Sequence, residues 1–86
     1  MNLSDTIISY KGDVLTGPAA VKGYDKLNTE HKKIFGEFLN NFYACWEFPE
    51  KHQPKKIKYV AGQIPYLRVD LAKGYWLHVM SPVQWF

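Results

Sequence analysis

The clearest pattern of apolar and polar positions runs through residues 29–47. At about 100° per residue, the apolar side chains fall within an arc of about 140° on one side of a helix. These apolar positions are Ile34, Phe35, Phe38, Leu39, Phe42, Cys45 and Trp46. Asn28 or Thr29 can cap the N-terminus, and Pro49 prevents the helix from continuing much beyond Phe48. The pattern therefore predicts an amphipathic helix over 29–47 with one face toward a core.

After Pro54 the apolar positions alternate with a period of two, which is typical of strands. The pattern predicts strands over 55–60, 66–71 and 75–80, with a tight turn at Gly74. The side chains expected to face inward are Ile57, Tyr59, Leu67, Val69, Leu71, Tyr75, Leu77 and Val79. We therefore predict an α+β fold in a single small domain over 1–86, with N-terminal helices packed on a three-stranded antiparallel β-meander.

The pattern before residue 29 is less regular. Pro18 suits the first position of a helix, because its missing N–H would have no partner there, and we expect a short helix to about Lys26. Residues 3–16 fit two structures. Ser4 could cap a helix that ends at Gly12, whereas the β-branched run before a turn at the same glycine would suit a hairpin. Of the two, we favour the helix.

The charged residues are unevenly distributed along the chain. Residues 51–86 carry six Lys or Arg and one acid, a net charge of +5, whereas residues 1–50 carry five Lys and seven acids, a net charge of −2. Clustered positive charge attracts an acidic partner. The single cysteine excludes an intramolecular disulfide, and no leader-like segment is recognisable, so we expect a cytoplasmic protein. No apolar run approaches the roughly 18 residues of a membrane span, so no membrane partner is expected.

The predicted meander places cations and flat rings on one outer face. The candidate binding residues on this face are Lys56, Lys58, Tyr66, Arg68, Trp76 and His78, with Asp70 among them. Lys and Arg can contact phosphates and aromatic rings can stack on bases, as in readers of single-stranded nucleic acid. The alternative is that the lysines are solvated charges that protect a sheet edge. We favour a small non-catalytic binding protein that engages nucleic acid or an acidic surface of a nucleic-acid-processing protein. Phage or mobile-element inhibitors such as anti-CRISPR proteins fall in this class.

The sequence gives less support to catalysis or to binding of a metal or cofactor. His78 beside Arg68 and Asp70 could exchange protons, but a sheet histidine with polar neighbours is more often structural, and we expect no catalytic residue. His31 and His52 lack a second ligand at metal-binding spacing, so no metal is expected. No glycine-rich phosphate loop is present, and we expect no cofactor. The thiol of Cys45 is expected to be buried and inert, because it falls on the apolar face of the predicted helix.

The last two residues, Trp85 and Phe86, are aromatic. They could pack back onto the core or anchor a partner, and we favour packing back because a small domain needs the apolar area. In the second case the chain could be a structural or assembly subunit, and its oligomeric state stays open.

The segments Tyr66–Asp70 and Tyr75–Val79, joined by a tight turn, resemble the final strands of RelE-like mRNA interferases. The resemblance covers about 15 residues. It implies metal-free cleavage of RNA by side chains on the sheet, with Arg68, His78 and Lys58 at the matching positions. Trp76 stands where that family usually has a second arginine.

Overall fold

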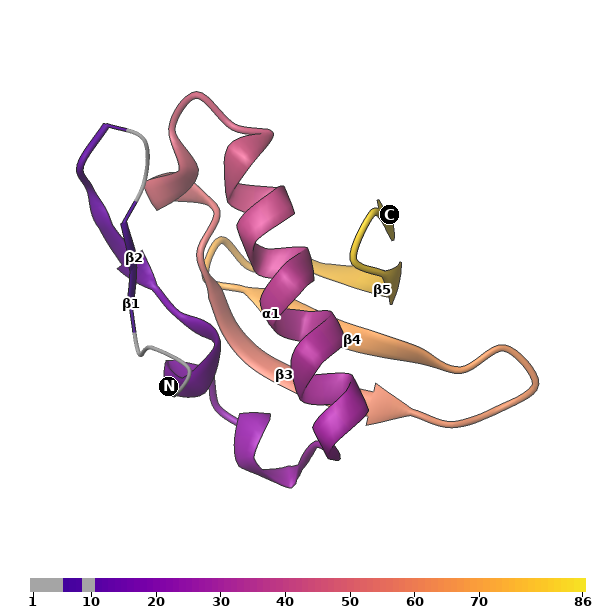
Figure 1. Ribbon diagram of the computed structural model, residues 1–86. Coiled ribbons are helices and arrows are strands. Elements are labelled where there is room, and N and C mark those ends of the chain that lie inside the picture. The colour runs from indigo at the N-terminus through magenta and orange to yellow at the C-terminus, as the bar shows by residue number, and fades with distance from the viewer. Residues whose placement is uncertain (1–5, 9–10) are drawn as a thin grey trace.

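A computed structural model of the chain describes residues 6–8 and 11–86 and shows an α+β architecture (Figure 1). Within these residues one helix, α1 (Thr29–Ala44), lies across one face of a four-stranded antiparallel sheet, and a separate two-stranded hairpin lies beside it. The sheet strands follow chain order: β3 (Pro54–Val60), β4 (Tyr66–Leu71), β5 (Trp76–Ser81) and β6 (Gln84–Trp85). None of the described helices combines the length and apolar character needed to cross a membrane.

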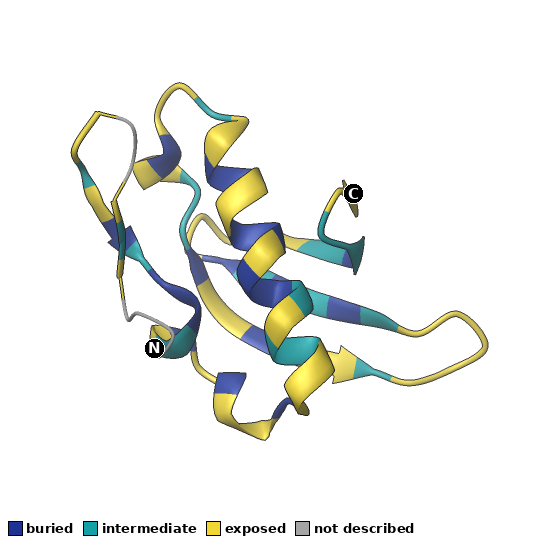
Figure 2. Cartoon of the chain, in the orientation of Figure 1, coloured by how far each residue is buried: buried dark blue, intermediate teal, exposed yellow. Residues whose placement is uncertain are grey.

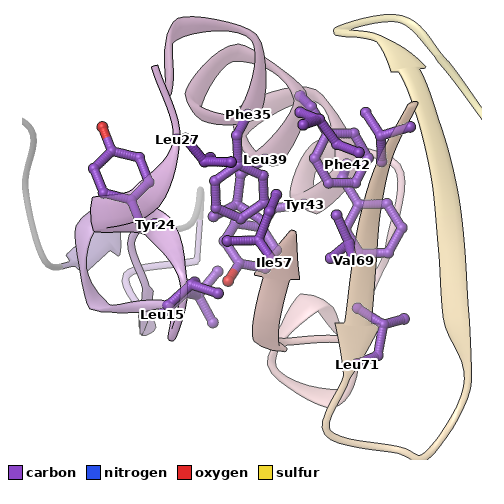
Figure 3. Close-up of a cluster of buried hydrophobic side chains, with 14 residues drawn as sticks. Leu15, Tyr24, Leu27, Phe35, Leu39, Phe42, Tyr43, Ile57, Val69 and Leu71 are labelled. Atoms are coloured by element: carbon purple, nitrogen blue, oxygen red, sulfur yellow. The ribbon is translucent and has the colours of Figure 1, made fainter. Parts of the chain in front are cut away.

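The core lies between α1 and the sheet, as the two periodicities predict. Phe35, Phe38 and Phe42 of α1 are at most 1% exposed. Figure 3 shows Phe35 and Phe42 on the side of α1 that faces Ile57 and Val69 of the sheet. Figure 2 shows the buried positions of α1 as a stripe on the side that faces the strands, with exposed positions opposite. Burial of this apolar face, rather than intrinsic helix propensity, supplies most of the stability of such a helix.

The helix is shorter than the predicted 29–47 span. Asn28 caps its start, since its side-chain oxygen accepts a hydrogen bond from the His31 N–H at 2.7 Å. At its end, the N–H groups of Cys45 and Trp46 bond to carbonyls three residues back, which tightens the chain into a turn. Pro49 follows and disfavours helical geometry at Phe48. Cys45 is therefore exposed at the end of α1, and the expectation of a buried thiol was wrong.

The predicted helix from Pro18 to Lys26 is replaced by two single turns of 3₁₀-helix, η1 (Pro18–Ala20) and η2 (Tyr24–Lys26). Gly23 separates them, with a φ of 96° that interrupts helical geometry. The backbone runs beside β3 at this point, where the Ile57 N–H donates to the Lys22 carbonyl at 2.8 Å. A continuous helix could not make this main-chain contact with the sheet edge.

Where the structure describes residues 3–16, they form a hairpin and not the helix that we favoured. Strand β1 (Thr6–Ile8) pairs with β2 (Val14–Thr16), and residues 3–5, 9 and 10, including the Ser4 cap, lie outside the described residues. Leu15 is 1% exposed, because β2 is fastened to the rest of the molecule. The backbone N–H and hydroxyl of Thr16 donate to Gln53 Oε1 at 2.7 and 2.8 Å, and the Tyr43 hydroxyl donates to the Thr16 carbonyl at 2.6 Å. Burial raises the pKa of Tyr43, which keeps this donor protonated.

The sheet has a fourth strand that we did not predict. In β6, Trp85 pairs with Val79 of β5 and packs edge-on against Phe38 and Phe42, with ring centroids 5.2 and 5.9 Å away. This contact confirms that Trp85 packs back onto the core, whereas the same prediction for Phe86 was wrong, since Phe86 is 67% exposed. Tyr59 has the predicted inward orientation, because it lies opposite Leu67 and stacks on His31 of α1, but it is 42% exposed. Tyr75 precedes β5, which begins at Trp76, and is also 42% exposed.

Candidate functional site

The register of the sheet brings the six predicted binding residues to one face. Lys58 lies opposite Arg68, which lies opposite His78, so these three side chains form one row across β3, β4 and β5. The next row contains Lys56, Asp70 and Trp76. Neighbouring positions alternate between faces, and the inward ones pack under α1. We call the opposite side, carrying these two rows together with Tyr66 and Phe86, the outer face.

His78 is the centre of a ring cluster on the outer face. Its ring centroid lies 4.6 Å from that of Tyr66, 4.5 Å from that of Trp76 and 4.6 Å from that of Phe86. Phe86 is held there by its backbone, because His78 and Phe86 exchange both N–H···O bonds at 2.8 and 3.0 Å. Trp76 and Phe86 are exposed, at 36% and 67%, whereas Tyr66 and His78 are half-buried between them. The result is a continuous aromatic surface over β4, β5 and the end of the chain.

Phe86 was missed as a member of this surface. The signal was present in the tail, since Trp85 and Phe86 are adjacent and must point to opposite faces if the tail is a strand. We assigned both residues the same role because no strand was predicted there. The hydrogen bonds to His78 extend the pairing beyond β6 and carry the Phe86 ring to the outer face.

Arg68 connects the charges of the outer face to its rings. Its Nε and Nη2 donate to Asp70 Oδ1 at 3.3 and 3.1 Å, and its guanidinium carbon lies 4.2 Å from the Trp76 ring centroid. An exposed ion pair of this kind contributes little to stability. Its effect is to orient the planar guanidinium, whose side chain keeps 39% of its surface exposed and retains unused donors for a ligand.

Lys56 and Lys58 supply further positive charge beside the rings. Both side chains are exposed, and neither forms an ion pair within the part of the chain that the structure describes. Asp70 lies opposite Lys56 but is engaged by Arg68. The outer face therefore presents three cations and one carboxylate around the ring cluster. This combination can hold phosphates at its margin and stack planar groups at its centre.

The remaining histidines and the cysteine do not join this site. His31 stacks on Tyr59 at 4.4 Å, and His52 stacks on Trp46 at 3.7 Å, both away from the two rows. Cys45 lies at the end of α1. Among residues 6–8 and 11–86, no group of three His, Cys, Asp or Glu side chains could hold a metal ion.

Comparisons with protein-family models, curated proteins and solved structures gave no match for this chain. The fold and the site alone define the class: a small basic α+β domain with one helix-covered sheet face and one basic and aromatic face. The function must therefore be argued from the chemistry of the outer face.

Proposed function

We propose that the chain is a small non-catalytic binding protein whose outer face binds single-stranded nucleic acid. The observation that carries this proposal is the ring cluster of Tyr66, Trp76, His78 and Phe86, which is accessible and bordered by Lys56, Lys58 and Arg68. Aromatic rings offer stacking partners to bases, and each stacked base contributes roughly 1–3 kcal/mol. Lysine and arginine neutralise phosphates and release counterions.

The rings favour a single strand over other acidic partners. In a duplex the bases are stacked on one another, so the side chains of a flat sheet reach mainly the phosphates. An acidic protein surface would use the cations but would leave the aromatic cluster without a planar partner. A splayed single strand uses both kinds of side chain at once.

The experiment is a fluorescence anisotropy titration of labelled oligouridylate and oligothymidylate, with a duplex of equal length for comparison. We expect single strands to bind more tightly. Trp76→Ala should weaken binding about 5- to 150-fold, the equivalent of one lost stacking contact. Lys58→Glu should also weaken binding and should make the dependence on salt shallower.

Lys33→Glu is the matched control, because it makes the same charge change on the exposed side of α1, away from the sheet. If Lys33→Glu weakens binding as much as Lys58→Glu, net charge alone explains the affinity and the proposal fails. If neither single strand nor duplex binds at low salt, the face has a different partner. An acidic groove of a nucleic-acid-processing protein is then the next candidate, and this is the mode in which an inhibitor of the anti-CRISPR kind would act.

A second candidate, a RelE-like endoribonuclease, has one observation in its favour: Lys58, Arg68 and His78 form a single cross-strand row. The same titration tests it, provided that the RNA is recovered afterwards and its length measured. Shortening of the RNA by the native protein, but not by His78→Ala, would replace the binding proposal with catalysis. If the RNA stays intact, the ribonuclease candidate is excluded.

The third candidate is a structural or assembly subunit that uses its exposed aromatics for self-contact. Size-exclusion chromatography at two protein concentrations separates it from the others. An obligate oligomer would elute ahead of the position of a 10.0 kDa chain at both concentrations.

A further inference from the structure

A second group of basic and aromatic side chains lies at the end of the sheet where β4 turns into β5. Three segments that are distant in the chain contribute to it. Its members are Lys11, Phe48, Lys51, His52, Lys73 and Tyr75, which we call the turn-end cluster. The ammonium groups of Lys11 and Lys51 lie 4.4 and 5.2 Å from the centroid of the Phe48 ring, so two cations share one aromatic ring. Phe48 itself is 46% exposed.

The other half of the cluster is organised around His52. Its ring stacks on Trp46 at 3.7 Å with the planes 15° apart, and the Tyr75 hydroxyl lies 3.5 Å from His52 Nδ1. A main-chain bond of 2.9 Å from the Ala72 N–H to the Gln53 carbonyl fastens the β4–β5 turn to this loop. The cluster is therefore held by contacts between the loop and the turn.

The electrostatics of the cluster favour an anion. Burial lowers the pKa of His52, and the nearby charges of Lys73 and Lys51 lower it further, whereas Glu50 acts in the opposite direction. The positive field of the two lysines at His52 is thus incompletely offset by the acid. A phosphate placed among these cations would relieve their mutual repulsion.

The turn-end cluster lies around the β4–β5 turn from the outer face. Lys56, Asp70 and Trp76 form the last paired row of the outer face before this turn. The Tyr75 side chain meets His52, which stacks on Trp46 at the α1 side of the sheet. A strand that stacks on Trp76 would therefore pass over the turn, where Lys73 is exposed, to reach Phe48. Five of the six cations of residues 51–86 thus lie on two surfaces that meet at the β4–β5 turn.

We propose that the turn-end cluster is a second contact site for the same nucleic-acid strand, with phosphates held by Lys51 and Lys73 and a base placed against Phe48. This inference rests on the proposed function of the outer face. It adds a direction to that function: the strand leaves the sheet at the β4–β5 turn. A short oligonucleotide would fill the outer face alone, whereas a longer one would reach both surfaces.

The test is an NMR titration of the full chain with oligothymidylates of about 4 and about 12 nucleotides, lengths within the range of single-strand site sizes. The short oligomer should shift only signals of the outer face. The longer one should also shift signals of Phe48 and His52, and it should raise the pKa of His52 because a phosphate stabilises the imidazolium. In Lys51→Gln/Lys73→Gln, the slope of log K against log salt for the longer oligomer should be shallower by about 1.4.

Lys26→Gln/Lys33→Gln is the control, since it removes the same charge from exposed positions elsewhere. Binding of both oligomers with no shift at Phe48 or His52, and with equal slopes in the two double variants, would overturn the inference and leave the proposed function intact. Failure of both oligomers to bind would overturn the proposed function itself.

Discussion

Gly23 shows how one residue fixes the course of the N-terminal third of the chain. Its φ of 96° lies in the left-handed region, and an added Cβ would meet the carbonyl oxygen of Ile57. Both conditions call for glycine: one through backbone conformation, the other through space. The close approach allows the Lys22 carbonyl to accept the hydrogen bond from the Ile57 N–H. Since β3 is an edge strand of the sheet, this bond covers part of an edge that could otherwise pair with another chain.

Gly23→Ala is expected to lower the free energy of unfolding by about 3 kcal/mol or more, because it adds backbone strain and breaks the bond between Lys22 and Ile57. Gly12→Ala separates the two effects. Gly12 also has a positive φ, 89°, but nothing lies within 4 Å of its added Cβ. This control should cost only the strain, about 1–2 kcal/mol. Urea denaturation of both variants measures the difference, and equal losses would show that the close approach is unimportant.

At the scale of elements, the end of the chain divides two roles between neighbouring residues. Trp85 of β6 points to the core and meets Phe38 and Phe42, whereas Phe86 stacks on His78 at the outer face. Strand alternation accounts for the division, since adjacent side chains emerge on opposite faces. The tail thus contributes to stability through one ring and to the candidate site through the next.

Trp85→Ala should lower the free energy of unfolding by about 2–3 kcal/mol, somewhat less than truncation of a fully buried tryptophan. Phe86→Ala should cost less than about 1 kcal/mol and should weaken oligonucleotide binding. Thermal unfolding and anisotropy titration of the two variants check both effects. The division of roles is wrong if Phe86→Ala destabilises the fold as much as Trp85→Ala, or if it leaves binding unchanged.

The elements that were predictable from the sequence are those with a long, regular period. Helix α1 and strands β3 to β5 follow directly from the spacing of their apolar residues. The hairpin β1–β2 was not predictable in this way, because its strands have three residues each and depend on bonds from Gln53 and Tyr43, which are distant in the chain. Local pattern cannot reveal such contacts.

The candidate site shows the same limit. Lys56, Lys58, Tyr66, Arg68, Trp76 and His78 could be placed together because strand alternation alone decides their face. Phe86 depended on an unpredicted strand pairing. The turn-end cluster depended on tertiary contacts, because Lys11 and Lys51 meet on Phe48 only once the hairpin, the loop after α1 and η3 (Pro49–Lys51) have come together.

At the scale of the whole molecule, the two faces of the four-stranded sheet have different roles. Helix α1 covers one face and excludes water from the core, so the apolar residues of the strands are used for stability (Figure 1). Five of the six cations of residues 51–86 lie on the outer face or around the β4–β5 turn. The charge asymmetry of the chain is therefore also an asymmetry between the two sides of the sheet.

The order of the elements along the chain has a consequence for synthesis. A ribosome delivers α1 before any strand of the four-stranded sheet, so Phe35, Phe38 and Phe42 remain uncovered until the strands that bury them have emerged. A fragment of residues 1–60 lacks Leu67, Val69, Leu71 and Val79 of the core, and we expect it to stay unfolded by circular dichroism. Adding a peptide of residues 61–86 should restore the native spectrum. A fragment that folded alone would show that the hairpin, α1 and β3 suffice as a nucleus, whereas complementation would mean that the newborn chain acquires this structure only once residues 61–86 have left the ribosome.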